Sequence, residues 1–126
     1  TGQKMPFYGG NITYKIDIEA KEAGRLKIMA GHYRGSLVKV KIDGKDAGRI
    51  VYSPYELISE EIVKGVHSVE LTLFGNRENT FGALHNYGDR EWYDGNQWYP
   101  EKYMCYEYLT EEAGILSAPE IELIKL

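Results

Sequence analysis

The stretch that decides the fold is residues 37–52, LVKVKIDGKDAGRIVY. Every second residue from Val38 to Ile42 is apolar and the residues between are charged, which predicts a strand with one buried face. Asp43-Gly44 then predicts a tight hairpin turn, because glycine accepts a positive φ without steric cost. We therefore expect an antiparallel return strand over residues 47–52.

The same two-residue period recurs along the rest of the chain. It predicts further strands over residues 12–18, 26–30, 69–73, 80–85 and 120–123. Helical signal is weak, because residues 54–63 and 110–116 have room for no more than a turn or two each. Seven or so short strands with glycine-rich turns and no crossover helices predict an all-β fold in which two antiparallel sheets form a β-sandwich.

Length and composition set the class of protein. The chain has 126 residues and a formal net charge of −4, which suits a single domain over residues 1–126. Because it begins at Thr1 rather than at Met, we expect it to be a piece of a longer protein. It has no block of basic residues and no long apolar run, so neither nucleic acid nor a membrane is an expected partner. Cys105 is its only cysteine, which excludes an internal disulfide and leaves the compartment open.

The aromatic residues are concentrated in one segment. The chain has 11 Tyr, 2 Trp and 3 Phe, and eight of these sixteen lie between positions 87 and 108: Tyr87, Trp92, Tyr93, Trp98, Tyr99, Tyr103, Tyr106 and Tyr108. Residues 86–104 are also rich in Asn, Asp and Gly, which break the strand rhythm. A loop of this length is usually functional or disordered, and its many rings favour an ordered one. Tyr106 and Tyr108 alternate as in a strand, so we expect them in the core or on a sheet face.

Three stretches together resemble a known family. They are residues 33–45 (YRGSLVKVKIDGK), residues 54–73, and residues 75–86 (GNRENTFGALHN). The sequence is similar to the galactose-binding-like β-sandwich modules that accompany bacterial glycoside hydrolases. This resemblance implies a jelly-roll sandwich that acts as a non-catalytic module beside a sugar-cleaving domain. Related sandwiches often carry a structural calcium ion, so the resemblance also admits one here.

The aromatic segment supplies the candidate ligand-binding site. Flat aromatic rings can stack on the C–H face of a pyranose at low entropic cost, while neighbouring polar groups bond the hydroxyls. We expect Trp92 and Trp98 to be exposed. The other candidates in the segment are Tyr87, Tyr93, Tyr99, His85, Asp89, Arg90 and Asn96, and a second loop adds Tyr33 and Arg34.

Two alternatives stay open for the same rings. They can pack internally onto the domain, or they can dock on a neighbouring catalytic domain of the same chain and bind no sugar. The expected partner is therefore a carbohydrate or that catalytic domain.

Catalytic and metal chemistry have less support in the sequence. His85 with Asp89 and Glu91 can be interpreted as a general acid–base group, but no nucleophile motif accompanies it, so no catalytic residue is predicted. The three histidines are scattered and match no zinc spacing. Asp89, Asp94 and Asn96 can offer oxygens to calcium, although Asp94-Gly95-Asn96 more simply forms a turn. No cofactor is predicted.

Overall fold

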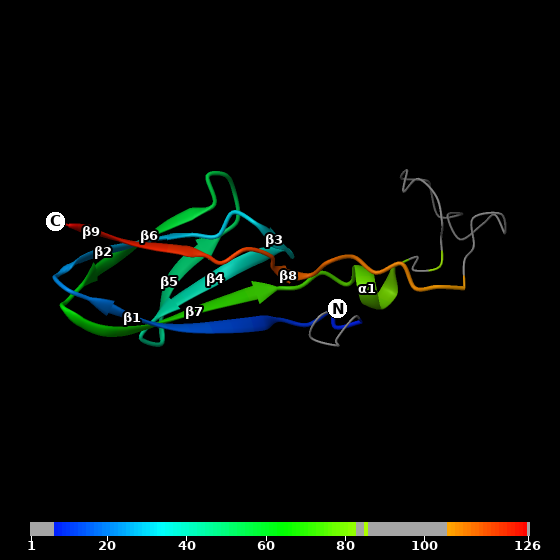
Figure 1. Cartoon of the computed structure of the whole chain (residues 1–126), viewed down its shortest axis with the longest axis horizontal. Helices are drawn as coiled ribbons and strands as arrows, with labels where there is room; N and C mark the ends of the chain where they lie inside the picture. The colour runs from blue at the N-terminus through cyan, green and yellow to red at the C-terminus, as the bar shows by residue number, and fades with distance from the viewer. Residues whose placement is uncertain (1–6, 83–84, 86–105, 126) are drawn as a thin grey trace. The chain divides into compact units, whose positions relative to one another are not determined.

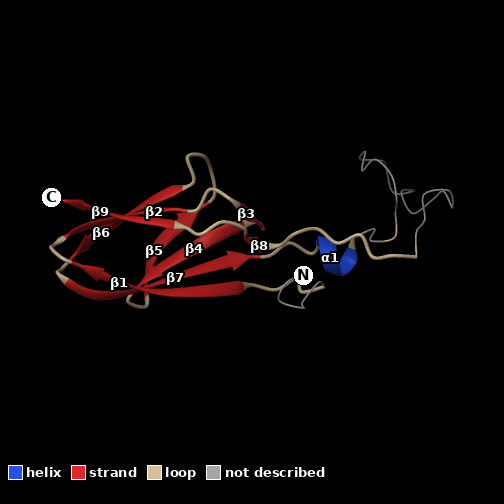
Figure 2. Ribbon diagram, viewed as in Figure 1, coloured by secondary structure: helices blue, strands red, loops and turns tan. Residues whose placement is uncertain are grey.

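The computed structural model describes residues 7–82, 85 and 106–125. Its secondary structure is almost entirely strand, as Figures 1 and 2 show. The elements are β1 (Ile12–Ala20), β2 (Gly24–Met29), β3 (Tyr33–Arg34), β4 (Leu37–Ile42), β5 (Lys45–Ile50), β6 (Glu56–Ile62), β7 (Gly65–Phe74), α1 (Glu78–Phe81), β8 (Gly114–Ile115) and β9 (Glu120–Lys125). The predicted all-β class with antiparallel strands is confirmed.

The strands form three hydrogen-bonded sheets. The largest has the order β1-β7-β4-β5, the second has the order β6-β2-β9, and β3 pairs with β8. Every pairing is antiparallel. The hairpin predicted at Asp43-Gly44 joins β4 to β5, and both turn residues have positive φ, 50° and 78°. The return strand begins at Lys45, two residues earlier than expected, because the turn needs only two residues.

One hydrophobic core joins the two larger sheets. Val40 of β4 and Val69 and Leu71 of β7 are fully buried, and Leu26 and Ile28 of β2 belong to the same cluster. The alternation seen in the sequence therefore reports the buried face of each strand. Burial of about ten such side chains is the main favourable contribution to folding, at roughly 1.5–3 kcal/mol each.

Residues 54–63, for which a helical turn was expected, instead contain β6. The expectation failed because the strand's alternation is hidden. Ser59, a polar residue, occupies the buried position, where its hydroxyl accepts a hydrogen bond from the Leu26 backbone at 2.9 Å. The β2–β6 register also shifts between Arg25 and Lys27, as a β-bulge does. Beyond this shift Ile62 packs against the core, although it lies three positions from the buried Ser59, whereas Ile58, opposite Lys27, is exposed.

Three other expectations about elements are also wrong. The strand expected over residues 80–85 is absent from the residues described there, because the helix α1 extends to Phe81 and neither Gly82 nor His85 lies in a strand. Residues 110–116, expected to form a helical turn, contain the short strand β8. Tyr106 and Tyr108 lie in no strand, and both rings are exposed rather than buried in a core or packed on a sheet.

The described residues fall into two compact units. One comprises residues 10–76 and 113–125 and contains all nine strands; the other comprises residues 7–9, 77–82, 85 and 106–112 and contains α1. Within the described ranges no helix has the length and apolar character needed to cross a bilayer.

Candidate functional site

Three of the ligand-binding residues predicted from the sequence fall within the described ranges. Tyr33 and Arg34 form β3, and His85 lies in the unit that contains α1. The remaining predicted residues lie outside the described ranges: Tyr87, Asp89, Arg90, Trp92, Tyr93, Asn96, Trp98 and Tyr99. The acid–base candidate Glu91 and the calcium candidate Asp94 also lie outside them.

His85 belongs to a small aromatic cluster. Its ring lies 4.4 Å from the ring of Tyr108, tilted by 50°. Phe7 contacts the same tyrosine edge-to-face, with ring centroids 4.9 Å apart. The name aromatic-rich stretch is used below for residues 86–105. Phe7 comes from the N-terminal end of the described chain, and His85 and Tyr108 come from the segments before and after that stretch, so the three rings bring these segments together.

Asn79 of α1 ties these two flanking segments together. Its side-chain amide donates a hydrogen bond to the carbonyl of Glu111 at 2.7 Å and accepts one from the Glu111 backbone N–H at 2.8 Å. The neighbouring Thr80 hydroxyl donates to the Phe7 carbonyl at 2.9 Å. Because Asn79 is 5% exposed, its amide groups need both partners. The reciprocal pair therefore fixes the base of the aromatic-rich stretch.

Large rings next to this base are exposed to solvent. Phe81 is 70% exposed and Tyr108 is 59% exposed, while Tyr106 is exposed over its whole side chain. Exposed aromatic groups that lie close along the chain are typical of interaction surfaces, because an isolated domain gains by burying them. These rings can therefore contribute to contact with a flat apolar ligand face or with a partner protein.

The strand-rich unit has its own pair of tyrosines in contact, Tyr33 and Tyr55, of which Tyr33 is half-buried. The Tyr33 ring packs edge-to-face on Tyr55 at 6.0 Å, and its hydroxyl donates to the Ile50 carbonyl at 3.2 Å. Burial raises the pKa of Tyr33 above its usual value. Arg34 and Tyr52 are exposed, Tyr52 to 83%. Arg34, Tyr52 and Tyr55 are the exposed side chains in this part of the sequence, so they are the ones that a ligand can reach.

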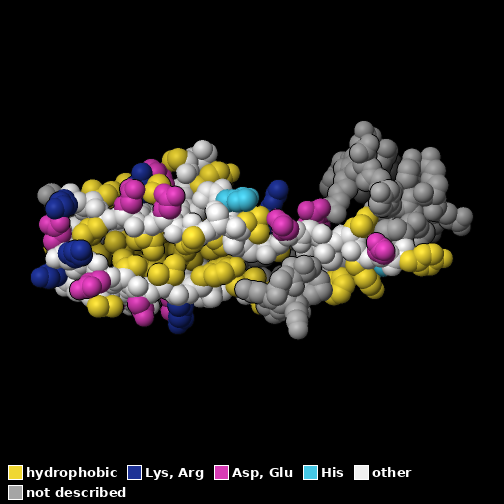
Figure 3. Space-filling model, viewed as in Figure 1, with side chains coloured by type: hydrophobic (Ala, Val, Ile, Leu, Met, Phe, Trp, Pro, Cys, Tyr) yellow, Lys and Arg dark blue, Asp and Glu magenta, His cyan; other side chains and the backbone are white. Residues whose placement is uncertain are grey.

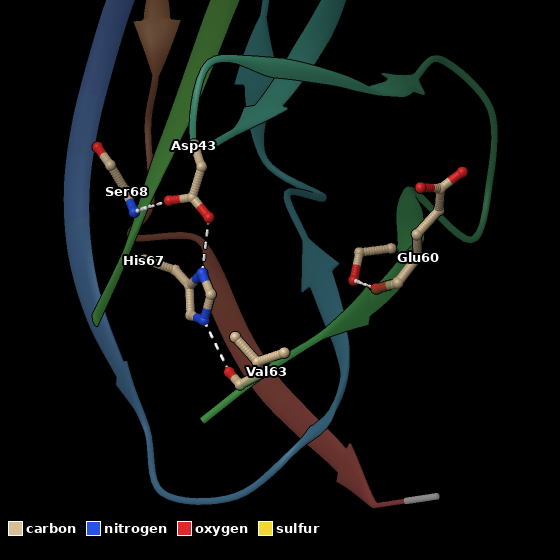
Figure 4. A network of polar contacts seen from close by, with 6 residues as sticks. Asp43, Glu60, Val63, His67 and Ser68 are labelled. Atoms are coloured by element: carbon tan, nitrogen blue, oxygen red, sulfur yellow. Dashed lines mark hydrogen bonds and ion pairs between the residues drawn. The ribbon is translucent and has the colours of Figure 1, made fainter. Parts of the chain in front are cut away.

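A polar network centred on His67 connects two turns of the same unit (Figure 4). Nδ1 of His67 lies 2.6 Å from Asp43 Oδ2, and Nε2 lies 2.8 Å from the Val63 carbonyl oxygen. The other Asp43 oxygen accepts a hydrogen bond from the Ser68 backbone N–H at 2.9 Å. Since carboxylate and carbonyl oxygens only accept, the imidazole satisfies both partners when it is protonated on both nitrogens.

The electrostatics of this network follow from those contacts. The hydrogen bond to Asp43, with the bond to the Val63 carbonyl, raises the pKa of His67 above its usual value. The same bond, with the Ser68 amide, lowers the pKa of Asp43. Both ring nitrogens are occupied and the side chain is buried, so His67 ties together the turns that follow β4 and β6 and has no nitrogen left to serve as a base.

Several of these residues were missed by sequence reasoning. Tyr52 and Tyr55 flank Ser-Pro in the turn after β5. Two tyrosines placed around a turn could have indicated rings at the surface. His67 was considered only as a zinc ligand, and the pairing that brings Asp43 beside it spans 24 positions of sequence. Within the described ranges no group of three or more His, Cys, Asp or Glu side chains is arranged to hold a metal ion.

Comparison with known proteins gives one structural likeness. No protein-family model matches the chain, and no curated protein matches it. A solved structure of the GH2 beta-galacturonidase from Eisenbergiella tayi, bound to galacturonate, is similar to part of it, with 26% sequence identity and a TM-score of 0.42. The similarity covers 52% of this chain and 12% of that enzyme.

Proposed function

We propose that this chain is a jelly-roll carbohydrate-binding or substrate-shaping module of a bacterial glycoside hydrolase. It binds a saccharide through the aromatic-rich stretch, residues 86–105, with Trp92 and Trp98 as stacking rings. The unit containing α1 holds the base of that stretch, and the module itself carries out no chemistry.

The strand pairing supports the jelly-roll part of the proposal. β4 pairs with β5, β2 pairs with β6 and β1 pairs with β7, so that the pairs are nested one inside another along the chain. Successive pairs alternate between sheets, because β2 and β6 lie in the smaller sheet and the other two pairs lie in the larger one. A long hairpin of nested antiparallel pairs, wrapped so that they alternate between two sheets, is the topology of a jelly roll.

The observation that carries the binding part is the exposure of Phe81, Tyr106 and Tyr108. Those rings flank the stretch that contains Trp92 and Trp98, and they face solvent instead of a core. Rigid aromatic groups at the base of such a stretch suit the binding of pyranose rings, because the bound ring buries apolar area without ordering a flexible side chain.

Saccharide binding by the whole chain tests the proposal. We expect retention on at least one polysaccharide of a glycan panel, and we expect Trp92→Ala and Trp98→Ala each to weaken it about fivefold or more, as loss of an aromatic anchor worth over 1 kcal/mol does. Tyr52→Ala is the control, because it removes a ring that is 83% exposed and lies in the strand-rich unit, and it should leave the retention intact.

The outcomes separate two functions. Loss of retention in the tryptophan variants, with unchanged circular dichroism, supports a binding module. A chain that retains no saccharide, but whose residues 86–105 gain protection from proteolysis when the parent's catalytic domain is added, would be a docking module instead. Glycoside turnover by the chain alone, abolished by His85→Ala, would overturn both.

A further inference from the structure

Strand β1 is a long edge strand. It runs for nine residues, contains no proline, and among the described strands has β7 as its single neighbour. The backbone groups on its other side therefore point away from the sheet. Natural proteins usually cover or interrupt such an edge, because its N–H and C=O groups are a template for another strand.

The same strand leaves apolar side chains partly uncovered. Tyr14, Ile16 and Ile18 pack against the core but are only half-buried, whereas Val69 and Leu71 beside them on β7 are fully buried. In Figure 3 hydrophobic side chains are visible along the strand-rich part of the molecule, between charged groups. A strand added to the β1 edge would cover the three half-buried side chains.

The sequence of β1 is complementary to itself when read antiparallel. If two copies pair about Ile16, Lys15 of each stands opposite Asp17 of the other, and Tyr14 stands opposite Ile18. All nine residues are paired in this register, and apolar side chains meet apolar ones on the core face. Opposite charges directly across a strand pair stabilise it.

The neighbouring registers are less favourable. A pairing centred on Lys15 places two lysines directly opposite each other, and one centred on Asp17 opposes two carboxylates. Like charges in that position are destabilising. Lys15 already contacts Glu70 of its own chain at 2.8 Å, but its ammonium group has three donors and is well exposed, so it can also reach a second carboxylate.

We propose that two copies of this chain associate through β1, paired antiparallel about Ile16, so that two four-stranded sheets become one eight-stranded sheet. The interface is isologous, because the same strand serves both partners. This inference does not depend on the proposed function, since it uses a different surface and would hold for a module that binds no saccharide.

Sedimentation equilibrium with charge-reversal variants tests it. We expect the native chain to reach twice its 14.4 kDa mass as concentration rises. Asp17→Lys and Lys15→Asp should each remain monomeric, and an equimolar mixture of the two should dimerise again, because each variant then meets the opposite charge. Glu60→Lys, the same kind of reversal on β6, is the control and should leave dimerisation unchanged.

A cross-linking pair keeps the proposal open to refutation if a charge variant folds poorly. In a Cys105→Ser background, Ile16→Cys places two thiols across the two-fold axis and should form a disulfide-linked dimer under mild oxidation. Thr13→Cys, which stands opposite Glu19 in the proposed register, should not. A native chain that stays monomeric at every concentration, or faster cross-linking at position 13 than at position 16, would overturn the proposal.

Discussion

His67 couples the stability of the molecule to pH. Its raised pKa means that the folded state binds a proton more tightly than the unfolded chain, whose histidine titrates near pH 6.5. The contribution of His67 to the free energy of unfolding is therefore complete below about pH 6.5, and it is lost as pH rises through the folded-state pKa. The lowered pKa of Asp43 acts in the opposite sense: its contribution is present above about pH 4 and is lost as pH falls through the folded value.

We expect the free energy of unfolding of the native chain to decrease as pH rises above about 6.5 and through the raised pKa of His67. His67→Gln should remove the part of that decrease which comes from the His67–Asp43 network. It should lower the free energy of unfolding by about 1 kcal/mol at pH 6, a modest amount because Asp43 is partly exposed and solvent screens the pair. Urea titrations over a pH series measure both effects. His32→Gln, at an exposed histidine with no part in the network, is the control, and an identical pH slope in the His67 variant would contradict the assignment.

At the scale of elements, the short helix α1 holds the base of the aromatic-rich stretch through Asn79. Asn79→Ala would leave the N–H and C=O of Glu111 without their side-chain partner, at a cost of roughly 1–3 kcal/mol. Asn79→Asp keeps an acceptor for the Glu111 N–H but sets a buried carboxylate oxygen against the Glu111 carbonyl, so it should cost at least as much stability as Asn79→Ala.

Amide hydrogen exchange at Glu111 measures this effect, and both variants should show lower protection there than the native chain. Thr80→Ala removes only one exposed hydrogen bond and should change the exchange little. Equal protection at Glu111 in all four proteins would show that the amide pair does not fix this segment.

The strands themselves show which elements a sequence can reveal. The alternating residues of β1, β4 and β7 predicted their buried faces, because each strand presents one face to the core. The alternation failed in β6, where a buried serine and a bulge interrupt it. It also misled at Thr80 and Phe81, which belong to the helix α1. Asn79 of that helix bonds a residue 32 positions away, a contact that a local pattern does not show.

For the candidate site, composition shows where the aromatic residues gather but not the contacts around them. The clustering of aromatic residues identified the aromatic-rich stretch, since composition alone shows it. The exposure of Tyr106 and the contact of His85 with Tyr108 were not predictable, because both depend on how distant segments meet at α1. The same holds for His67 and Asp43, which are brought together by the pairing of β4 with β7.

At the scale of the whole molecule, one core should make the two larger sheets unfold together. Ile28→Ala in β2 and Leu71→Ala in β7 each remove a fully buried side chain and should each cost about 2–5 kcal/mol. Because both side chains belong to the same cluster, Ile28→Ala should also lower the amide protection of β7, which lies in the other sheet.

Hydrogen exchange read residue by residue measures that coupling. Ile58→Ala, at an exposed position of β6, is the control and should cost less than about 1 kcal/mol. Loss of protection confined to β2, β6 and β9 in the Ile28 variant would mean that the sheets are stabilised independently.

The nested pairing of strands also has a consequence for how the chain reaches its native state. The β4–β5 hairpin closes the smallest loop and so carries the lowest entropic cost of closure, whereas β1 must wait for β7 before it has any partner. The native contacts should therefore form from the innermost hairpin outward, with substitutions in β4 and β5 giving higher φ-values than those in β1. During synthesis β1 would leave the ribosome well before its partner β7, and among these strands it would be one of the last to find its place.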